Sequence, residues 1–151
     1  MQMRIVRGAM IAGIYVVLTF AFAPISYGPL QIRIAEALTV LPYVWPEAVG
    51  GLFIGCLLAN ILGGLGIWDN VLGSLATLVA ALLTRKMPKI WLAPLPPVVA
   101  NGLIVGGYLS VLYHMPLQLT IGYVAAGQAI ACYLLGLILL HIMLKYDLDR
   151  L

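Results

Sequence analysis

Charged side chains are rare in this chain and fall in a few clusters, and this distribution most limits what the chain can fold into. Only 9% of the 151 residues are charged, whereas 64% are hydrophobic and the mean hydropathy is +1.09. A soluble domain of this size carries about 25% charged residues. The sequence therefore predicts an all-α integral membrane protein.

The positions of the cations predict how the chain crosses the bilayer. If six helices cross it, three cationic clusters lie on the same side as both termini, which the positive-inside rule identifies as the cytoplasm. An odd number of helices would separate the terminal clusters, so an even number is favoured, and Arg33 alone faces outward. The three clusters are Arg4 and Arg7; Arg85, Lys86 and Lys89; and Lys145 and Arg150.

Six apolar segments are candidate membrane helices, and we expect them to form one domain over residues 1–151. The first has roughly the 20 residues that a span requires. Pro46 and Glu47 open the third segment, where an acid near a helix N-terminus is favourable, so Glu47 is predicted to be a cap or helix-dipole residue. The expected helices cover about residues 4–23, 34–45, 46–62, 69–84, 98–113 and 119–144.

The stretch from Tyr27 to Tyr43 concentrates polar side chains between two apolar segments. Gln31, Arg33 and Glu36 lie within six residues. Arg33 and Glu36 are three apart and share a face if the helix has begun by Arg33. Ionisable residues in membrane segments are functional-site candidates because burying them is costly. The alternative is an ion pair that only orients the loop.

Most other polar and aromatic candidates are predicted to lie on the same, outer side of the membrane. A mostly apolar site with a few convergent amides and carboxylates suits a small, flat, hydrogen-bonding ligand. Two members have equally good structural interpretations, since Asp69 would cap its helix and Trp68 suits the interfacial belt. The outer candidates are Asn60, Trp68, Asp69, Asn70, Tyr108, Gln118 and Tyr123, with Gln128 near mid-membrane. Asn101 is placed near the inside, in a half expected to hold few buried polar groups.

Enzymatic chemistry finds little support in the sequence. No catalytic motif is present, and the two histidines lie on opposite sides of the predicted membrane. The two cysteines, Cys56 and Cys132, form no disulfide framework, metal cluster or CxxC motif. We therefore predict no catalytic residue, metal site, cofactor or nucleic-acid partner. Nothing resembles a nucleotide-binding domain either, so active uptake would need partner subunits.

Small residues near the start of the first helix form two overlapping pairs spaced four apart. The pairs are Gly8 with Ala12 and Ala9 with Gly13. Such a surface lets another helix approach closely, either within the protein or on a partner.

The stretch Tyr27–Pro42 reads YGPLQIRIAEALTVLP. It resembles the signature G-P-[IL]-Q-x-R-x-[AS]-E-A-L-T-x-L-P of the queuosine-precursor transporter (QueT) family, whose members are substrate-binding S components of energy-coupling factor (ECF) transporters. The resemblance extends to the size of the chain, the six helices and the small residues of helix 1. It implies a multi-pass subunit of a bacterial or archaeal cell membrane that binds a 7-deazaguanine from outside.

The resemblance also implies partners, namely a transmembrane T component and two cytoplasmic ATPases. The family's AxxxA docking motif maps onto Ala9 and position 13, where this chain has Gly13. The residue stays small, although the motif is altered.

A guanine-like edge presents an N1–H beside an exocyclic amine, and Glu36 is the best bidentate acceptor for it. We hypothesise that Gln31 and Arg33 position this edge, that Trp68 or Tyr108 stacks on the ring, and that Asp69 meets a cationic aminomethyl group. Two alternatives stay open: an S component for another small vitamin-like ligand, and a small membrane enzyme or structural subunit.

Overall fold

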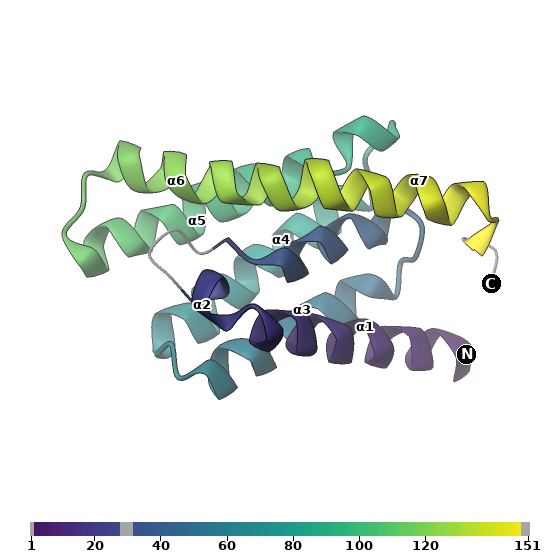
Figure 1. Ribbon diagram of the computed structural model, residues 1–151, viewed down its shortest axis with the longest axis horizontal. Coiled ribbons are helices and arrows are strands. Elements are labelled where there is room, and N and C mark those ends of the chain that lie inside the picture. Colours follow the sequence, from purple (N-terminus) through teal and green to yellow (C-terminus); the bar gives the residue numbers. More distant parts are fainter. Residues whose placement is uncertain (1, 28–31, 149–151) are drawn as a thin grey trace.

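A computed structural model describes residues 2–27 and 32–148, and every regular element in this part of the chain is a helix. In Figure 1, η2 continues into α4, and α6, η4 and α7 form one long rod. The elements are α1 (Gln2–Ala21), α2 (Ala23–Ser26), η1 (Ile34–Tyr43), α3 (Ala48–Gly63), η2 (Asp69–Gly73), α4 (Ser74–Thr84), η3 (Ile90–Leu92), α5 (Leu95–Tyr113), α6 (Leu117–Ala129), η4 (Ile130–Gly136) and α7 (Leu137–Lys145).

Within the described residues, three helical stretches are long and apolar enough to cross a membrane: Gln2–Ala21, Ile90–Tyr113 and Leu117–Lys145. The apolar helices Ile34–Tyr43, Ala48–Gly63 and Asp69–Thr84 are shorter. A helix of 16 residues is about 24 Å long, against a hydrocarbon core of about 30 Å. The predicted all-helical fold is confirmed, whereas the six-span count stays a prediction.

The start of α1 and the end of α7 lie at the same end of the molecule (Figure 1). Arg7 near the start of α1 and Leu148 just after α7 line one apolar cavity of about 290 Å³. This placement agrees with an even number of crossings. The assignment of that end to the cytoplasm rests on the charge pattern alone.

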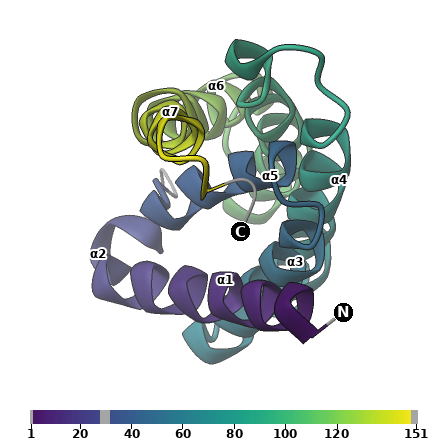
Figure 2. The same cartoon turned by 90° about the vertical axis from the view of Figure 1, so that its right-hand side faces the viewer.

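The helix η1 lies at the centre of the fold. Seven of its ten residues are buried, and it packs against α1, α3, α4, α5, η4 and α7 (Figure 2). It is a 3-10 helix throughout, which is unusual for ten residues. Its backbone has additional side-chain partners, because the Thr39 hydroxyl (2.5 Å) and the Cys132 thiol (3.3 Å) both donate to the carbonyl of Glu36.

A close contact joins α1 to α3 through small residues, and we call it the α1/α3 seam. A Cβ atom on Gly51 would lie 2.5 Å from the Gly8 carbonyl oxygen, and one on Gly55 would lie 3.0 Å from the Cα of Ala12. The pair Gly8/Ala12 is therefore an internal packing surface. The other predicted pair of small residues does not pack in this way, because Ala9 and Gly13 are exposed on the surface of α1.

Glu47 occupies the N-cap position of α3, where a cap or helix-dipole residue is expected, but its side chain makes no capping hydrogen bond. The carboxylate instead accepts from the Arg7 guanidinium at 3.0 Å, and that guanidinium also lies over the Trp45 ring at 5.2 Å. A charge-assisted hydrogen bond is stronger than a neutral one, so the carboxylate turns across the seam toward Arg7.

Candidate functional site

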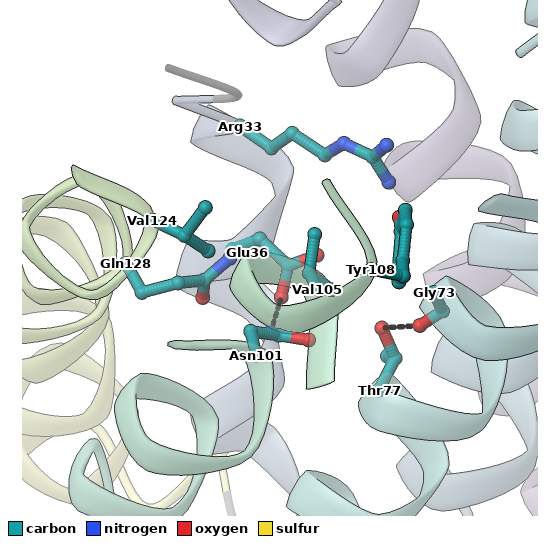
Figure 3. Close-up of a pocket in the computed structure, with 9 residues that line it drawn as sticks. All are labelled: Arg33, Glu36, Gly73, Thr77, Asn101, Val105, Tyr108, Val124 and Gln128. Atoms are coloured by element: carbon teal, nitrogen blue, oxygen red, sulfur yellow. Dashed lines mark hydrogen bonds between the residues drawn. The ribbon is translucent and has the colours of Figure 1, made fainter. Parts of the chain in front are cut away.

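A small pocket between η1, η2, α4, α5 and α6 collects polar side chains in the interior (Figure 3). Its volume is about 10 Å³, which is room for about one water molecule. The side chains around it are therefore closely packed on one another. The pocket is lined by Arg33, Glu36, Gly73, Thr77, Asn101, Val105, Tyr108, Val124 and Gln128.

Glu36 is the buried carboxyl of this pocket, with 2% of the residue exposed. One carboxyl oxygen accepts from the Tyr15 hydroxyl of α1, and the other accepts from the Asn101 amide of α5 at 3.3 Å. A buried carboxylate is tolerated only when such partners satisfy it. Glu36 therefore links η1 to helices on both sides.

Arg33 reaches the same pocket from the residue before η1, where the backbone is extended. Its guanidinium donates to the Asn60 amide oxygen at 2.9 Å and pairs with the Asp69 carboxylate at 3.6 Å. The Asn60 amide group in turn donates to the Asp69 carbonyl at 2.7 Å. Arg33 and Glu36 face one pocket, as predicted, although Arg33 precedes the helix.

Asp69 joins this network from η2, and the prediction that it caps a helix is wrong. The helix already begins at Ile67, so Asp69 lies inside it rather than at its N-cap. Asp69 is 3% exposed, and its carboxylate accepts from the Tyr108 hydroxyl at 2.7 Å. The turn η2 is π-helical, a form that often occurs at functional sites.

The native cysteines pack beside the two buried charged groups. Both are free thiols. Cys56 lies 3.8 Å from the Arg33 guanidinium, with Thr77 at 3.4 Å, and Cys132 contacts the η1 backbone and the Gln128 amide. Both thiols therefore pack as small, soft side chains against the polar cluster.

Tyr27 anchors the beginning of the polar stretch against α3. Its hydroxyl donates to the Ala59 carbonyl at 2.9 Å, and its ring packs so closely that a Cβ on Gly63 would lie 2.7 Å from it. Burial raises the pKa of this hydroxyl, so it remains a protonated donor at neutral pH.

The structure brings together most but not all of the predicted site residues. Arg33, Glu36, Asn60, Asp69, Tyr108 and Gln128 belong to one buried or half-buried cluster. Trp68 and Tyr123 are 55% and 47% exposed and do not line the pocket, and Gln118 is also exposed. Asn70 lies beside the cluster, half-buried, with a buried oxygen that has no hydrogen-bond partner. Gln31 falls outside the described residues.

Three polar members of the cluster were missed: Tyr15, Thr77 and Asn101. All three are almost completely buried, at 0%, 1% and 2% exposure. Asn101 had been assigned to the inner half of the membrane, yet its amide donates to the Glu36 carboxylate. For Asn101 the signal was available, since an amide within an apolar membrane helix is itself a functional-site candidate.

Comparison with known proteins matches this chain to a protein family. A sequence model described as QueT transporter matches residues 5–145 of this chain. Over 77 residues, the chain is 36% identical to a protein of Lactococcus lactis subsp. cremoris named "Queuosine precursor transporter QueT". That alignment covers 50% of this chain and 45% of the relative, so the chain matches slightly less than half of the relative's length.

No solved structure matches the chain. The family model, however, extends over nearly all of it and includes every residue that lines the central pocket. This membrane protein belongs to the QueT transporter family.

Proposed function

We propose that the chain is the membrane-embedded substrate-binding subunit, or S component, of an ECF-type importer, and that it binds a 7-deazaguanine precursor of queuosine. The observation that carries the proposal is the buried carboxyl of Glu36 at an interior pocket, in a chain of this family. An ionised carboxylate has about four acceptor positions. Tyr15 and Asn101 use one on each oxygen, which leaves acceptor capacity for adjacent donors on a ligand.

The surrounding groups suit the rest of a guanine-like ring. The Arg33 guanidinium is held by Asn60 and Asp69, so it presents fixed donors to a ligand carbonyl. Val105 and Val124 offer apolar surface for the ring faces, and Gln128 and Thr77 add polar groups at the margin. Pockets of this composition, apolar with a few placed polar groups, are typical of small-molecule sites.

The pocket is too small to hold a ligand in the described conformation. At about 10 Å³ it is far below the roughly 300 Å³ or more of a typical ligand pocket. The described conformation is closed, and binding requires side chains to move apart. Ligand binding therefore includes a conformational step.

The exposed face of α1 that carries Ala9 and Gly13 is the proposed docking surface for the T component. Ala9 and Gly13 are exposed, and a Cβ on Gly13 would meet no atom within 4 Å. They line a groove of about 830 Å³ together with residues of α3, including Gly50 and Ile54. Small residues along a groove let a partner helix approach closely. ATP hydrolysis would be supplied by two cytoplasmic ATPases bound to that component.

Equilibrium binding to the purified, detergent-solubilised chain tests the ligand class. We expect saturable binding of aminomethyl-7-deazaguanine, cyano-7-deazaguanine or queuine that excess thiamine and biotin do not displace. Displacement by either vitamin would favour an S component for another ligand. No binding of any deazaguanine would contradict the proposed function.

Substitution of Gly13 tests the docking surface separately. A Gly13→Leu variant should lose co-purification with the T component, because the larger side chain fills the groove, and should keep its ligand affinity. Gly13→Ala should assemble normally because the residue remains small. Leu134→Phe, on the exposed side of η4, is the control. Normal assembly of Gly13→Leu would place docking elsewhere.

A further inference from the structure

Tyr108 separates two cavities of opposite character. On one side its ring closes the polar pocket of about 10 Å³, where Figure 3 shows it between Arg33 and Gly73. On the other side it lines a lateral cavity of about 210 Å³ whose other walls are Trp68, Val111 and Leu112. The polar pocket has the hydrogen-bonding groups but no room, and the lateral cavity has room but apolar walls.

Among the described residues, one hydrogen bond holds the Tyr108 hydroxyl. Its hydroxyl donates to the Asp69 carboxylate at 2.7 Å, and a Cβ on Gly73 would lie 3.5 Å from that hydroxyl. Asp69 itself is held independently, because its carboxylate pairs with Arg33 and its carbonyl accepts from Asn60. The tyrosine can therefore leave while the acceptor stays in place.

The lateral cavity offers the displaced ring a suitable environment. Trp68 is 55% exposed and Val111 is 76% exposed, so the cavity opens at the surface of the molecule. It lies next to the connections at residues 64–66 and 114–116, at the end that the charge pattern assigns to the outside. An amphipathic tyrosine there can bury its ring against apolar walls and direct its hydroxyl toward polar surroundings.

We propose that Tyr108 is a displaceable plug of the binding site: its ring fills ligand space in the closed form and rotates into the lateral cavity when ligand binds. The Asp69 oxygen that loses the tyrosine hydroxyl then accepts from a donor on the ligand. This inference rests on the proposed function for the identity of the ligand. Beyond that function, it assigns to Tyr108 control of access to the site. Because the closed form competes with ligand binding, Tyr108 also lowers the apparent affinity.

Filling the lateral cavity tests this proposal most directly. Leu112→Trp removes the space that receives the ring, so it should weaken aminomethyl-7-deazaguanine binding about 10-fold. In a Tyr108→Ala background there is no ring to receive, and the same substitution should change affinity less than twofold. Leu103→Trp, on the exposed side of α5 away from this cavity, is the matched control.

Tyr108→Phe tests the hydroxyl. Without the bond to Asp69 the closed form is less favoured, so a larger fraction of the protein is open and competent to bind. Ligand association should therefore be several-fold faster and apparent affinity higher. Tyr113→Phe, an exposed tyrosine of the same helix, should leave the rate unchanged. An unchanged affinity in Leu112→Trp, or an equal loss in the presence and absence of Tyr108, would overturn the plug.

Fluorine NMR of 3-fluorotyrosine protein follows the ring without relying on affinity. The Tyr108 signal, assigned from Tyr108→Phe, should show a second conformer that ligand enriches and Leu112→Trp suppresses. If wild-type protein binds no deazaguanine, the proposed function fails. The plug is then judged on this signal alone, and one conformer that Leu112→Trp leaves unchanged would overturn it.

Discussion

The central cluster and the α1/α3 seam are both tightly packed, but they depend on different physical properties. The cluster buries Arg33, Glu36 and Asp69 around a nearly closed pocket and satisfies them through specific hydrogen bonds. The seam relies on the absence of side chains at Gly8 and Gly51. Changes at the cluster should therefore act on ligand recognition, and changes at the seam should act on stability.

The irregular helices also distinguish the two regions. The 3-10 helix η1 and the π-helical segments η2 and η4 all contribute to or adjoin the cluster, whereas the seam joins two regular α-helices. Departures from α-helical geometry are costly and are frequent at functional sites. In this protein η1 carries Glu36 and η2 carries Asp69 into the same buried cluster.

The largest expected effect on recognition comes from Glu36→Gln, which would break the cluster's chemistry without changing its size. The amide cannot offer two charged acceptors to adjacent donors, and a hydrogen bond to a charged group contributes about 1.5–3 kcal/mol. We expect about 100-fold weaker binding of a 7-deazaguanine, measured by titration calorimetry.

Asp147→Asn is the control for that change. It also removes one carboxylate, at an exposed position with φ of 51°, a conformation that asparagine adopts readily. Its affinity should match that of the wild type. Equal affinities for Glu36→Gln and Asp147→Asn would remove Glu36 from the ligand site.

Gly51→Ala would break the seam and should leave the cluster's specificity intact. Its Cβ would overlap the Gly8 carbonyl, so α1 and α3 must move apart. Overpacking of this kind costs about 1–3 kcal/mol. We expect the melting temperature of the detergent-solubilised protein to fall by several degrees, while the folded fraction keeps its ligand preference.

Gly50→Ala provides the matched comparison for the seam, because its Cβ would meet no atom within 4 Å. That variant should be as stable as the wild type or slightly more stable, since alanine favours helix. If both variants melted at the same temperature, the close approach of α1 and α3 would contribute nothing to stability.

Asn101→Ala tests whether the ligand site includes a residue of the cluster that the sequence interpretation placed elsewhere, near the inside of the membrane. The substitution removes the amide that donates to Glu36. We expect about 10-fold weaker ligand binding, the effect of one or two hydrogen bonds. Asn101→Gln retains the amide and should recover part of the loss. Unchanged affinity in Asn101→Ala would remove Asn101 from the ligand site.

Trp68→Phe should have the smallest effect, because Trp68 lies at the edge of the cluster. An exposed aromatic contact contributes about 1 kcal/mol or less, so affinity should change by about fivefold at most. Trp91→Phe is matched to it, since the two indoles are 55% and 56% exposed at different places in the chain. A loss above 10-fold in Trp68→Phe alone would show direct stacking on the ligand.

Much of the cluster could be predicted from single residues, because charged and amide side chains are costly in apolar helices. This argument correctly selected Arg33, Glu36, Asn60 and Gln128 for the cluster. It failed where position was inferred from depth along a straight helix. Asn101 was placed near the inside, yet it meets Glu36 because the short helix η1 carries that carboxyl into the interior.

Local rules also failed where a distant partner competed. Asp69 and Glu47 both stand near helix N-termini, and capping was a reasonable prediction for each. Their carboxylates turn instead to Tyr108 with Arg33 and to Arg7, respectively. A side chain near a helix end has several possible donors, and the stronger charged donor is supplied by another helix.

The sequence by itself determined the membrane class, the helical fold and the family, because these follow from composition and from a local signature. Only the tertiary structure decided which polar groups meet, which pair of helix-1 residues packs inside and which remains exposed, and that Tyr108 divides two cavities. The physical reason is that hydropathy and spacing act along one helix. Hydrogen bonds between buried groups depend on how several helices, one of them a 3-10 helix, are packed together.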